Sequence, residues 1–330
     1  GTVTTPAPPA TVTASVSGWA PLPLDETIVP AARDHLVLVS GGGQVVAAGA
    51  FSAAVVLESR DAFGNVSGVG AATSIGLTGP ADFLYFADPA CTVLAGASLP
   101  LPTGTTQATF YWKGTAVQSA MVDAAAGTWP VVPIAVTVTP AARDHLVLVS
   151  GGGQSVPAGS CSAAVVLESR DAFGTVSGVG PATSIGLTGP ADFLYFTDPA
   201  CAVPAAASLP LPAGTSQVNF WFKGTVVTAA PPATVTASVS GWAPLPIDET
   251  IVPAARDHLV LVSGGGQVVA AGACSAAVVL ESRDGLGNVS GGGPATSVAL
   301  TGPADFLYFP YAACTVPAGP SLPLPPGPSQ

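Results

Sequence analysis

Residues 161–171, with the sequence CSAAVVLESRD, decide the fold class of this chain. Alternate residues fall on opposite sides of an extended backbone, with Cys161, Ala163, Val165 and Leu167 on one side and Ala164, Val166, Glu168 and Arg170 on the other. A period of two with charge on one side only predicts a half-buried β-strand. Residues 217–223, QVNFWFK, alternate in the same way, and turn signals such as Gly151-Gly152-Gly153 separate these runs. The chain is therefore expected to be all-β.

The composition excludes several classes of protein. The chain of 330 residues has 39 glycines and 34 prolines, with 48% hydrophobic and only 8% charged residues. Intrinsic disorder needs the opposite balance of charge and apolar content, and glycine without a three-residue period excludes collagen. The formal net charge of −11 removes the positive surface that a nucleic-acid partner requires. Because no apolar run reaches about 18 residues, we expect no membrane span.

Three recurring strings set the organisation of the chain. PAARDHLVLVSGGGQ has its arginine at Arg33, Arg143 and Arg256, SAAVVLESRD ends at Asp61, Asp171 and Asp284, and TGPADFLYF ends at Phe86, Phe196 and Phe309. The arginines are 110 and 113 residues apart, a length that matches a small independent domain rather than a solenoid unit. About seven short strands per repeat favour a sandwich of antiparallel sheets, with a barrel as the alternative.

The two ends of the chain carry parts of the same unit. Residues 1–44 almost repeat residues 224–267, and Gln330 is the counterpart of Gln217. We therefore expect four segments: residues 1–29 as terminal strands of a preceding domain or of a neighbouring subunit, 30–139 as repeat one, 140–252 as repeat two, and 253–330 as repeat three without its C-terminal strands.

An incomplete sandwich exposes unpaired strand edges, which a strand from another unit can cover. In one interpretation, residues 1–29 of one subunit complete repeat three of the next, and this non-closing contact makes a filament. In the other, the chain is part of a longer covalent array of repeats. This second interpretation is favoured because neither end supplies the counterpart of Val218–Lys223. The segment expected at the contact contains Thr11, Val12, Thr13, Ala14, Val16 and Trp19.

The cysteines point to an oxidising compartment. Two pairs share a spacing of 40 residues, Cys161 with Cys201 and Cys274 with Cys314. This predicts one disulfide in each of repeats two and three, with buried free cysteines as the alternative. In repeat one, Phe51 stands where Cys91 would find its partner, so Cys91 is expected to be an unpaired thiol. Disulfides indicate a location outside the cytosol.

The repeats resemble bacterial immunoglobulin-like domains. The likeness lies in AGSCSAAVVLESRDAFGTVSG, ADFLYFTDPAC, SQVNFWFKGT and ATVTASVSGW, which are similar to the Big-type repeats of invasin-like and intimin-like adhesins, with their Asp-x-x-Gly-Asn turn. In this chain the turn has the sequence Asp61-Ala-Phe-Gly-Asn65 in repeat one and Asp284-Gly-Leu-Gly-Asn288 in repeat three. Repeat two differs in its last residue, with the sequence Asp171-Ala-Phe-Gly-Thr175. The resemblance implies immunoglobulin-like sandwiches in a linear array, in a large secreted surface protein that extends, spaces or adheres.

No residue pattern favours catalysis. His35, His145 and His258 occupy the same Arg-Asp-His position in each repeat. A catalytic base needs a third group in a pocket, whereas a sequence neighbour in a strand points to the opposite face. We expect no catalytic residue and no cofactor.

Two kinds of surface site are candidates. The carboxylates of Asp61, Asp171 and Asp284 are weak candidates for calcium, which prefers hard oxygen ligands, and the alternative is that they shape their turns. Asn65 and Asn288 begin Asn-Val-Ser sequons and are candidate glycosylation sites.

The tryptophans could stack on carbohydrate, but core or junction packing is the favoured interpretation. They are Trp19, Trp112, Trp129, Trp221 and Trp242. We expect Trp112 and Trp221 to share a strand of repeats one and two, on the side opposite to the phenylalanines.

Together these patterns predict a non-enzymatic structural protein at the cell surface or in the extracellular space. Its immunoglobulin-like domains join end to end into a filament or rod, and its partner is itself, as a homopolymer or a covalent array. The alternative is an adhesin stalk or a module that binds surface glycans. A third, weaker interpretation is a non-catalytic appendage of a secreted hydrolase.

Overall fold

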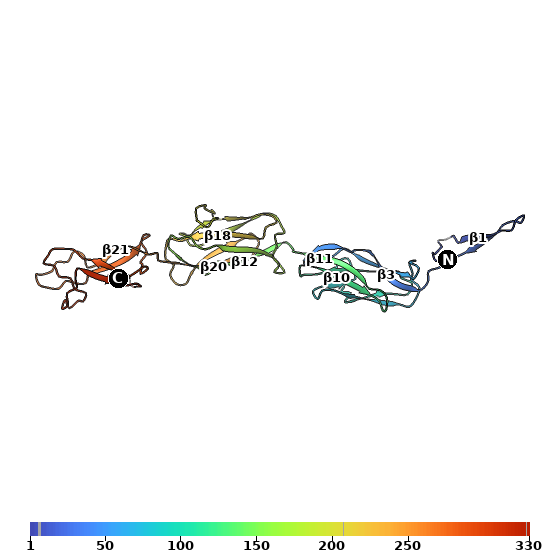
Figure 1. The fold of residues 1–330 in the computed structure, drawn as a ribbon, viewed down its shortest axis with the longest axis horizontal. Coiled ribbons are helices and arrows are strands. Elements are labelled where there is room, and N and C mark those ends of the chain that lie inside the picture. The colour runs from blue at the N-terminus through green and yellow to red at the C-terminus, as the bar shows by residue number, and fades with distance from the viewer. Residues whose placement is uncertain (6–7, 207, 328) are drawn as a thin grey trace. The chain divides into compact units, whose positions relative to one another are not determined.

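The computed structural model describes residues 1–5, 8–206, 208–327 and 329–330, and it consists of strands and turns (Figure 1). No helix occurs in these residues, and none of them forms a helix that could cross a membrane. The all-β prediction is confirmed. By compactness the chain divides into two units, one made of Gly1–Arg143 with Arg170–Val179 and the other of Asp144–Ser169 with Gly180–Gln330.

In the first unit, repeat one is an immunoglobulin-like sandwich. Its strands are β3 (Arg33–Ser40), β4 (Gln44–Ala47), β5 (Val55–Asp61), β6 (Thr73–Thr78), β7 (Leu84–Phe86), β8 (Ser98–Leu101), β9 (Gln107–Lys113), β10 (Gln118–Ala125) and β11 (Val132–Thr139). They form one sheet of order β3-β5-β9-β7 and a second of order β4-β11-β10-β6-β8. One apolar cluster joins the sheets and includes Leu57 and Phe110 from the first and Ile75 and Val122 from the second.

The first strand of repeat one changes sheet at Gly41. This residue has a φ of +90°, and a Cβ atom on it would lie 2.6 Å from the Cα atom of Val55, so only glycine fits. After the break that the glycine run predicted, β4 continues in the direction of β3 and lies parallel to β11. The sheets are antiparallel, as predicted, and this edge pair is a parallel addition, because two pieces of one strand keep their direction while joining different sheets.

Most of the second unit is an equivalent sandwich in repeat two. Its strands are β12 (Arg143–Ser150), β13 (Ser155–Pro157), β14 (Val165–Asp171), β15 (Thr183–Thr188), β16 (Leu194–Phe196), β17 (Ser208–Leu211), β18 (Gln217–Lys223), β19 (Ala233–Ser238) and β20 (Leu245–Val252). The sheet orders are β12-β14-β18-β16 and β13-β20-β19-β15-β17. Val165 and Leu167 are fully buried, as predicted. Glu168 is also buried rather than exposed, because the side chain of Gln217 covers it and donates to its Oε2 atom at 2.8 Å.

Three small sheets complete the described strands. In the first unit, β1 (Ala10–Ala14) pairs with β2 (Leu22–Glu26); in the second, β21 (Arg256–Ser263) pairs with β22 (Val279–Asp284) and β23 (Thr296–Ala299) with β24 (Ser321–Leu324). Each described strand falls inside one of the four segments predicted from the sequence.

The position of Trp112 corrects the predicted strand pattern. When the strings QATFYWK and QVNFWFK are aligned, Trp112 is equivalent to Phe222 and Trp221 is equivalent to Tyr111. Trp112 therefore shares the inward side with Phe110 and is fully buried. Its ring stacks on Phe83 with centroids 5.0 Å apart. Strand parity, rather than residue type, decides which aromatic ring enters the core.

Candidate functional site

The hairpin of β1 and β2 presents an uncovered apolar face. Val12 lies opposite Leu24, the same register that pairs Val235 with Ile247 in the hairpin of β19 and β20. Val235 is 0% exposed in the core of repeat two, whereas Val12 is 55% exposed. The same local sequence thus forms the same hairpin with and without a sandwich to cover it.

All the residues predicted at a contact between units lie on this hairpin. Thr11, Val12, Thr13 and Ala14 belong to β1, and Val16 and Trp19 belong to the turn that follows it. The N–H of Trp19 donates to the carbonyl of Val16 at 3.0 Å, and Trp242 makes the same bond to Val239. Trp242 packs against the core of repeat two, while Trp19 is 75% exposed. In repeat two the equivalent side chains pack against the rest of the sandwich. The hairpin of β1 and β2 has the same side chains but no sandwich for them to pack against.

Repeat three has the complementary feature. Leu146 and Phe193 are buried in the core of repeat two, but their counterparts Leu259 and Phe306 are exposed, Phe306 to 60%. Within the part of the chain that the structure describes, no counterparts of β18, β19 or β20 accompany β21 to β24. The exposed side chains are those that such strands cover in repeat two.

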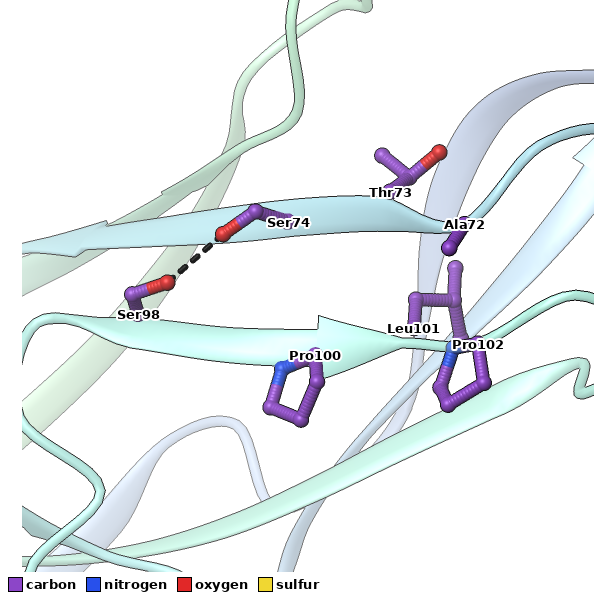
Figure 2. Close-up of a pocket in the computed structure, with 7 residues that line it drawn as sticks. All are labelled: Ala72, Thr73, Ser74, Ser98, Pro100, Leu101 and Pro102. Carbon is purple, nitrogen blue, oxygen red and sulfur yellow. Dashed lines mark hydrogen bonds between the residues drawn. The ribbon is translucent and has the colours of Figure 1, made fainter.

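A shallow hollow along β8 is a poor candidate for a ligand site. Its volume is about 390 Å³, and its lining is Ala72, Thr73, Ser74, Ser98, Pro100, Leu101 and Pro102, without a charged side chain (Figure 2). Strand β8 is the outermost of its sheet, and Pro100 has no N–H to offer a further strand. The hydroxyls of Ser74 and Ser98 bond each other at 2.6 Å. This edge is protected against lateral pairing.

The histidine of each repeat pairs with its neighbouring aspartate. Nδ1 of His35 lies 3.1 Å from Oδ2 of Asp34, although neighbours in a regular strand point to opposite faces. A bulge between Arg33 and His35 in the pairing of β3 with β5 brings the two side chains together, which corrects that expectation. The same pair recurs as Asp144 with His145 and Asp257 with His258. Both members are partly exposed, as a solvated surface pair would be.

The calcium candidates are engaged in their own turns. Oδ1 of Asp61 accepts the N–H groups of Phe63 and Asn65 at 3.0 and 2.9 Å, and Oδ2 accepts that of Ala31 at 2.9 Å. Burial raises the pKa of Asp61, but the side chain of Asn65 and these N–H groups outweigh it and hold the pKa below its ordinary value. Asp171 and Asp284 bind their turns in the same way. No three His, Cys, Asp or Glu side chains gather as a metal site among the described residues.

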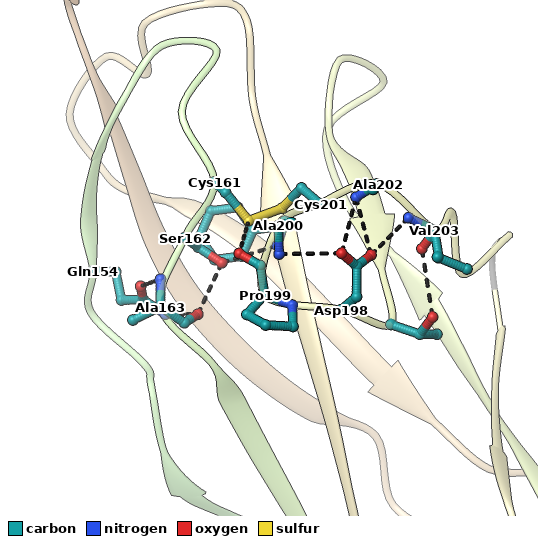
Figure 3. Close-up of a disulfide and its surroundings, with 12 residues drawn as sticks. Gln154, Cys161, Ser162, Ala163, Asp198, Pro199, Ala200, Cys201, Ala202 and Val203 are labelled. Carbon is teal, nitrogen blue, oxygen red and sulfur yellow. Dashed lines mark hydrogen bonds between the residues drawn. A yellow bond between two sulfur atoms is a disulfide. The ribbon is translucent and has the colours of Figure 1, made fainter.

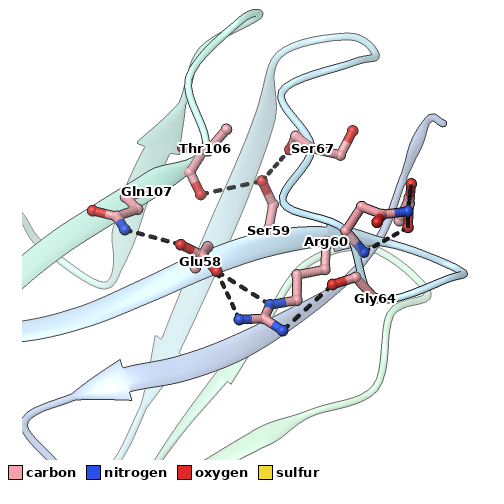
Figure 4. A network of polar contacts seen from close by, with 9 residues as sticks. Glu58, Ser59, Arg60, Gly64, Ser67, Thr106 and Gln107 are labelled. Carbon is pink, nitrogen blue, oxygen red and sulfur yellow. Dashed lines mark hydrogen bonds and ion pairs between the residues drawn. The ribbon is translucent and has the colours of Figure 1, made fainter. Parts of the chain in front are cut away.

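Glu58 belongs to a polar network on β5 (Figure 4). Arg60 pairs with its Oε1 atom at 3.0 Å, and Gln107 donates to Oε2 at 3.0 Å. The neighbouring hydroxyl of Ser59 donates to the carbonyl of Ser67 at 2.7 Å. These partners satisfy the carboxylate and tie β5 to β9, so the network is structural.

Disulfides join Cys161 to Cys201 and Cys274 to Cys314, and Cys91 is free and buried. Figure 3 shows the loop that presents Cys201. Asp198 organises this loop, because its carboxylate accepts N–H groups that include that of Val203 at 2.6 Å. The backbone of Cys201 is left-handed, with a φ of +50°.

The candidate glycosylation sites already make hydrogen bonds. Nδ2 of Asn65 donates to the carbonyl of Thr2 at 2.9 Å, and Nδ2 of Asn288 donates to that of Thr225 at 3.0 Å. A sugar on either nitrogen would compete with these bonds. Glycosylation therefore stays a prediction, and the structure indicates a second use for the two side chains.

No protein-family model and no curated protein sequence matches the chain. Solved structures match at low identity. Domains 5–6 of the S-layer protein SbsC share 16% identity and a TM-score of 0.24, over 68% of this chain and 99% of theirs. The Escherichia coli adhesin FdeC shares 15% identity and a TM-score of 0.35, over 69% of this chain and 68% of its own. A β-glycosidase from Bacteroides vulgatus shares 10% identity and a TM-score of 0.29, over 66% of this chain and 24% of its own. Because such different proteins match so weakly, no functional argument rests on them.

Proposed function

We propose that the chain is a non-enzymatic extracellular structural protein whose immunoglobulin-like repeats join end to end, with a hairpin from one unit adding to the incomplete sandwich of another. The observation that carries the proposal is the exposure of Val12, whose counterpart Val235 is fully buried. Burial of apolar surface contributes about 25 cal/mol of free energy per Å². Packing of the uncovered face of β1 and β2 against a sandwich of another unit is therefore favourable. The exposed Leu259 and Phe306 of repeat three are surfaces of the matching kind.

The pairing in repeat two supplies the geometry of such a contact. There β19 lies beside β15, with Leu187 opposite Ala237. Strand β1 is the counterpart of β19, and β23 is the counterpart of β15. Hairpin addition along β23 would extend the sheet of β23 and β24 by two strands and cover the part of the exposed face that β19 and β20 cover in repeat two. Because the contact joins two different surfaces, each unit keeps one free surface of each kind, and units that add without closing into a ring form a filament.

Other features support this assignment. Disulfides in repeats two and three suit an oxidising extracellular compartment. Pro100 in β8 and Pro210 in β17 block the outer edge of each second sheet, which favours growth through the ends of the sandwiches over lateral pairing. The threefold recurrence of the Asp–His pair fits a repeated surface feature better than an active site.

The test is sedimentation velocity of the full chain over a range of concentrations. We expect concentration-dependent assembly that V12D abolishes, because a carboxylate would enter the apolar interface. T13D adds the same charge at the neighbouring residue, on the other side of β1, and is expected to assemble like the unchanged protein. A chain that stays monomeric throughout, or a V12D variant that assembles normally, would refute the proposal.

The intact mass of the reduced protein from its natural source identifies the source of the partner sandwich. A mass near 32.1 kDa would make the contact one between subunits. A mass several-fold larger would mean that the hairpin completes a repeat of the same covalent array.

The exposure of Trp19 favours a second candidate, a module that binds surface glycans. An aromatic ring with a free face can stack on a sugar. A glycan array probed with the full chain and with W19A would test it, since a glycan site at Trp19 requires a signal that W19A loses.

A further inference from the structure

The fifth residue of the Asp-x-x-Gly-Asn turn contacts the repeat before it. In the second unit, Nδ2 of Asn288 donates to the carbonyl of Thr225 at 3.0 Å, and its Oδ1 accepts the N–H of Val227 at 3.2 Å. The carboxamide thus satisfies one backbone acceptor and one backbone donor that are two residues apart. Both backbone groups belong to the loop that follows β18 in repeat two.

The first unit repeats this arrangement with another copy of the same loop. Nδ2 of Asn65 donates to the carbonyl of Thr2 at 2.9 Å, and its Oδ1 accepts the N–H of Thr4 at 3.2 Å. Thr2 and Thr4 are the counterparts of Thr225 and Val227. Asp61 fixes the orientation of the amide, since both of its oxygens accept from Nδ2 of Asn65 at 3.2 and 3.1 Å.

The third residue of the turn adds an apolar contact. A Cβ atom on Gly159 would lie 3.1 Å from Cδ1 of Leu286, and one on Gly49 would overlap the ring of Phe173. These glycines have φ values of +77° and +74°, a backbone conformation in which any other residue would be strained. Turn and glycine therefore form a matched surface between consecutive repeats.

The turn of repeat two lacks the amide. Thr175 takes the fifth position, and among the described residues no hydrogen bond joins it to Thr115 or Val117, the counterparts of Thr225 and Val227. A hollow of about 360 Å³ lies there instead, lined by Thr115, Ala116, Val117, Phe173 and Thr175. The threonine side chain is shorter than that of asparagine and cannot bond both backbone groups.

We propose that the fifth residue of this turn is a latch through which each repeat binds the backbone of the repeat before it. Asparagine closes the latch, as at Asn65 and Asn288, and threonine leaves it open at Thr175. All the contacts lie within one chain. The inference therefore stands independently of the end-to-end assembly proposed above.

Residue-resolved amide exchange by NMR on the full chain tests the latch. We expect N288T to speed the exchange of the Val227 amide about tenfold, the effect of one lost hydrogen bond. T175N is expected to slow the exchange of the Val117 amide by a similar factor. The chain must be produced without glycosylation, because T175N completes an Asn-x-Ser sequon.

The amide of Ile251 is the control, because it donates to Oγ1 of Thr228 at 3.0 Å, whereas Asn288 bonds Thr225 and Val227. Threonine is the natural residue at 175, so N288T keeps the bonds of Asp284 within the turn. Unchanged exchange at both Val227 and Val117 would overturn the proposal. Equal acceleration at Val227 and Ile251 would also overturn it, because it would show general loosening rather than loss of a latch.

Discussion

The ring of Phe51 meets that of Phe86 edge-on, with centroids 5.9 Å apart, at the position where repeat two has Cys161. Cys91, the counterpart of Cys201, is buried and has a φ of +51°, against +50° for Cys201. The loop of repeat one thus already has the conformation that presents a cysteine to a disulfide in repeat two.

We expect F51C to form a third disulfide with Cys91. The closed loop spans 40 residues, as in repeat two, and should stabilise repeat one by about 4 kcal/mol in the chain-entropy model. Burial and the charge of Asp88 raise the pKa of the Cys91 thiol, which Lys113 opposes, so oxidation needs an alkaline buffer or a catalyst. Thiol titration in denaturant should find no free thiol, and two would contradict the prediction. F51A, which loses the ring and gains no bond, is the matched control.

Glu249 occupies a core position where repeat one has Val136. It is 1% exposed, its Oε1 atom has no hydrogen-bond partner among the described residues, and its Oε2 atom accepts the N–H of Gln154 at 2.9 Å. Burial raises the pKa of Glu249 to about 7, opposed by the Gln154 N–H and helped by Asp248. The folded state therefore binds this proton more tightly than the unfolded state does.

The stability of repeat two should consequently fall as the pH rises. The contribution is fully present below the ordinary pKa of 4.5 and is lost as the pH passes through about 7, by about 3 kcal/mol. E249V copies Val136 and E249Q keeps the shape without the charge, and both should remove this slope. Urea denaturation at about pH 5 and about pH 8 measures it, and a slope that persists in both variants would contradict the assignment.

Asp284 should respond to pH in the opposite sense. Burial raises its pKa, but the side chain and N–H of Asn288, with the N–H groups of Ala254 and Leu286, lower it below 3.8. Its contribution is present above that value and is lost as the pH falls through the lowered pKa. D284N turns an acceptor oxygen into a donor and should cost about 2 kcal/mol. Acid unfolding followed by circular dichroism, with D305N at an exposed position as control, would show no difference if the turn were not held by this carboxylate.

Trp112 should tolerate phenylalanine. Its Nε1 atom is buried without a hydrogen-bond partner in the described chain, and its counterpart Phe222 stacks on Phe193 as Trp112 does on Phe83. W112F should therefore cost less than about 1.5 kcal/mol, whereas W112A should cost about 3–5 kcal/mol through the cavity it leaves. Chemical denaturation of the two variants measures the difference, and equal losses would show that the indole is required.

Much of the fold could be predicted from alternation and repetition. The inward side of β14 at Val165 and Leu167 follows from a period of two, and the break at Gly41 follows from the glycine run. At Glu168 the prediction from alternation failed because of the neighbouring strand. Glu168 is buried because Gln217 covers it, and a neighbouring strand's side chain is invisible to a local pattern.

The candidate site was harder to predict. Asp34 and His35 lie together because of a bulge in strand pairing, and Asn65 meets Thr2 from 63 residues away. The recurrence of asparagine at 65 and 288, against threonine at 175, was the available signal. It suggested a sugar, because the sequon is a local string while the hydrogen-bond partners belong to another repeat.

The sequence by itself determined the β-strands, the three repeats and the spacing of the cysteines, because strand alternation and turn chemistry depend on neighbours along the chain. Only the tertiary structure decided which copies of a segment are covered. Val12 and Val235 have the same neighbours in sequence and the same cross-strand register, yet one is exposed and the other buried. Burial requires a second sheet from distant residues, and the presence of that sheet distinguishes the buried strand of repeat two from the exposed strand β1.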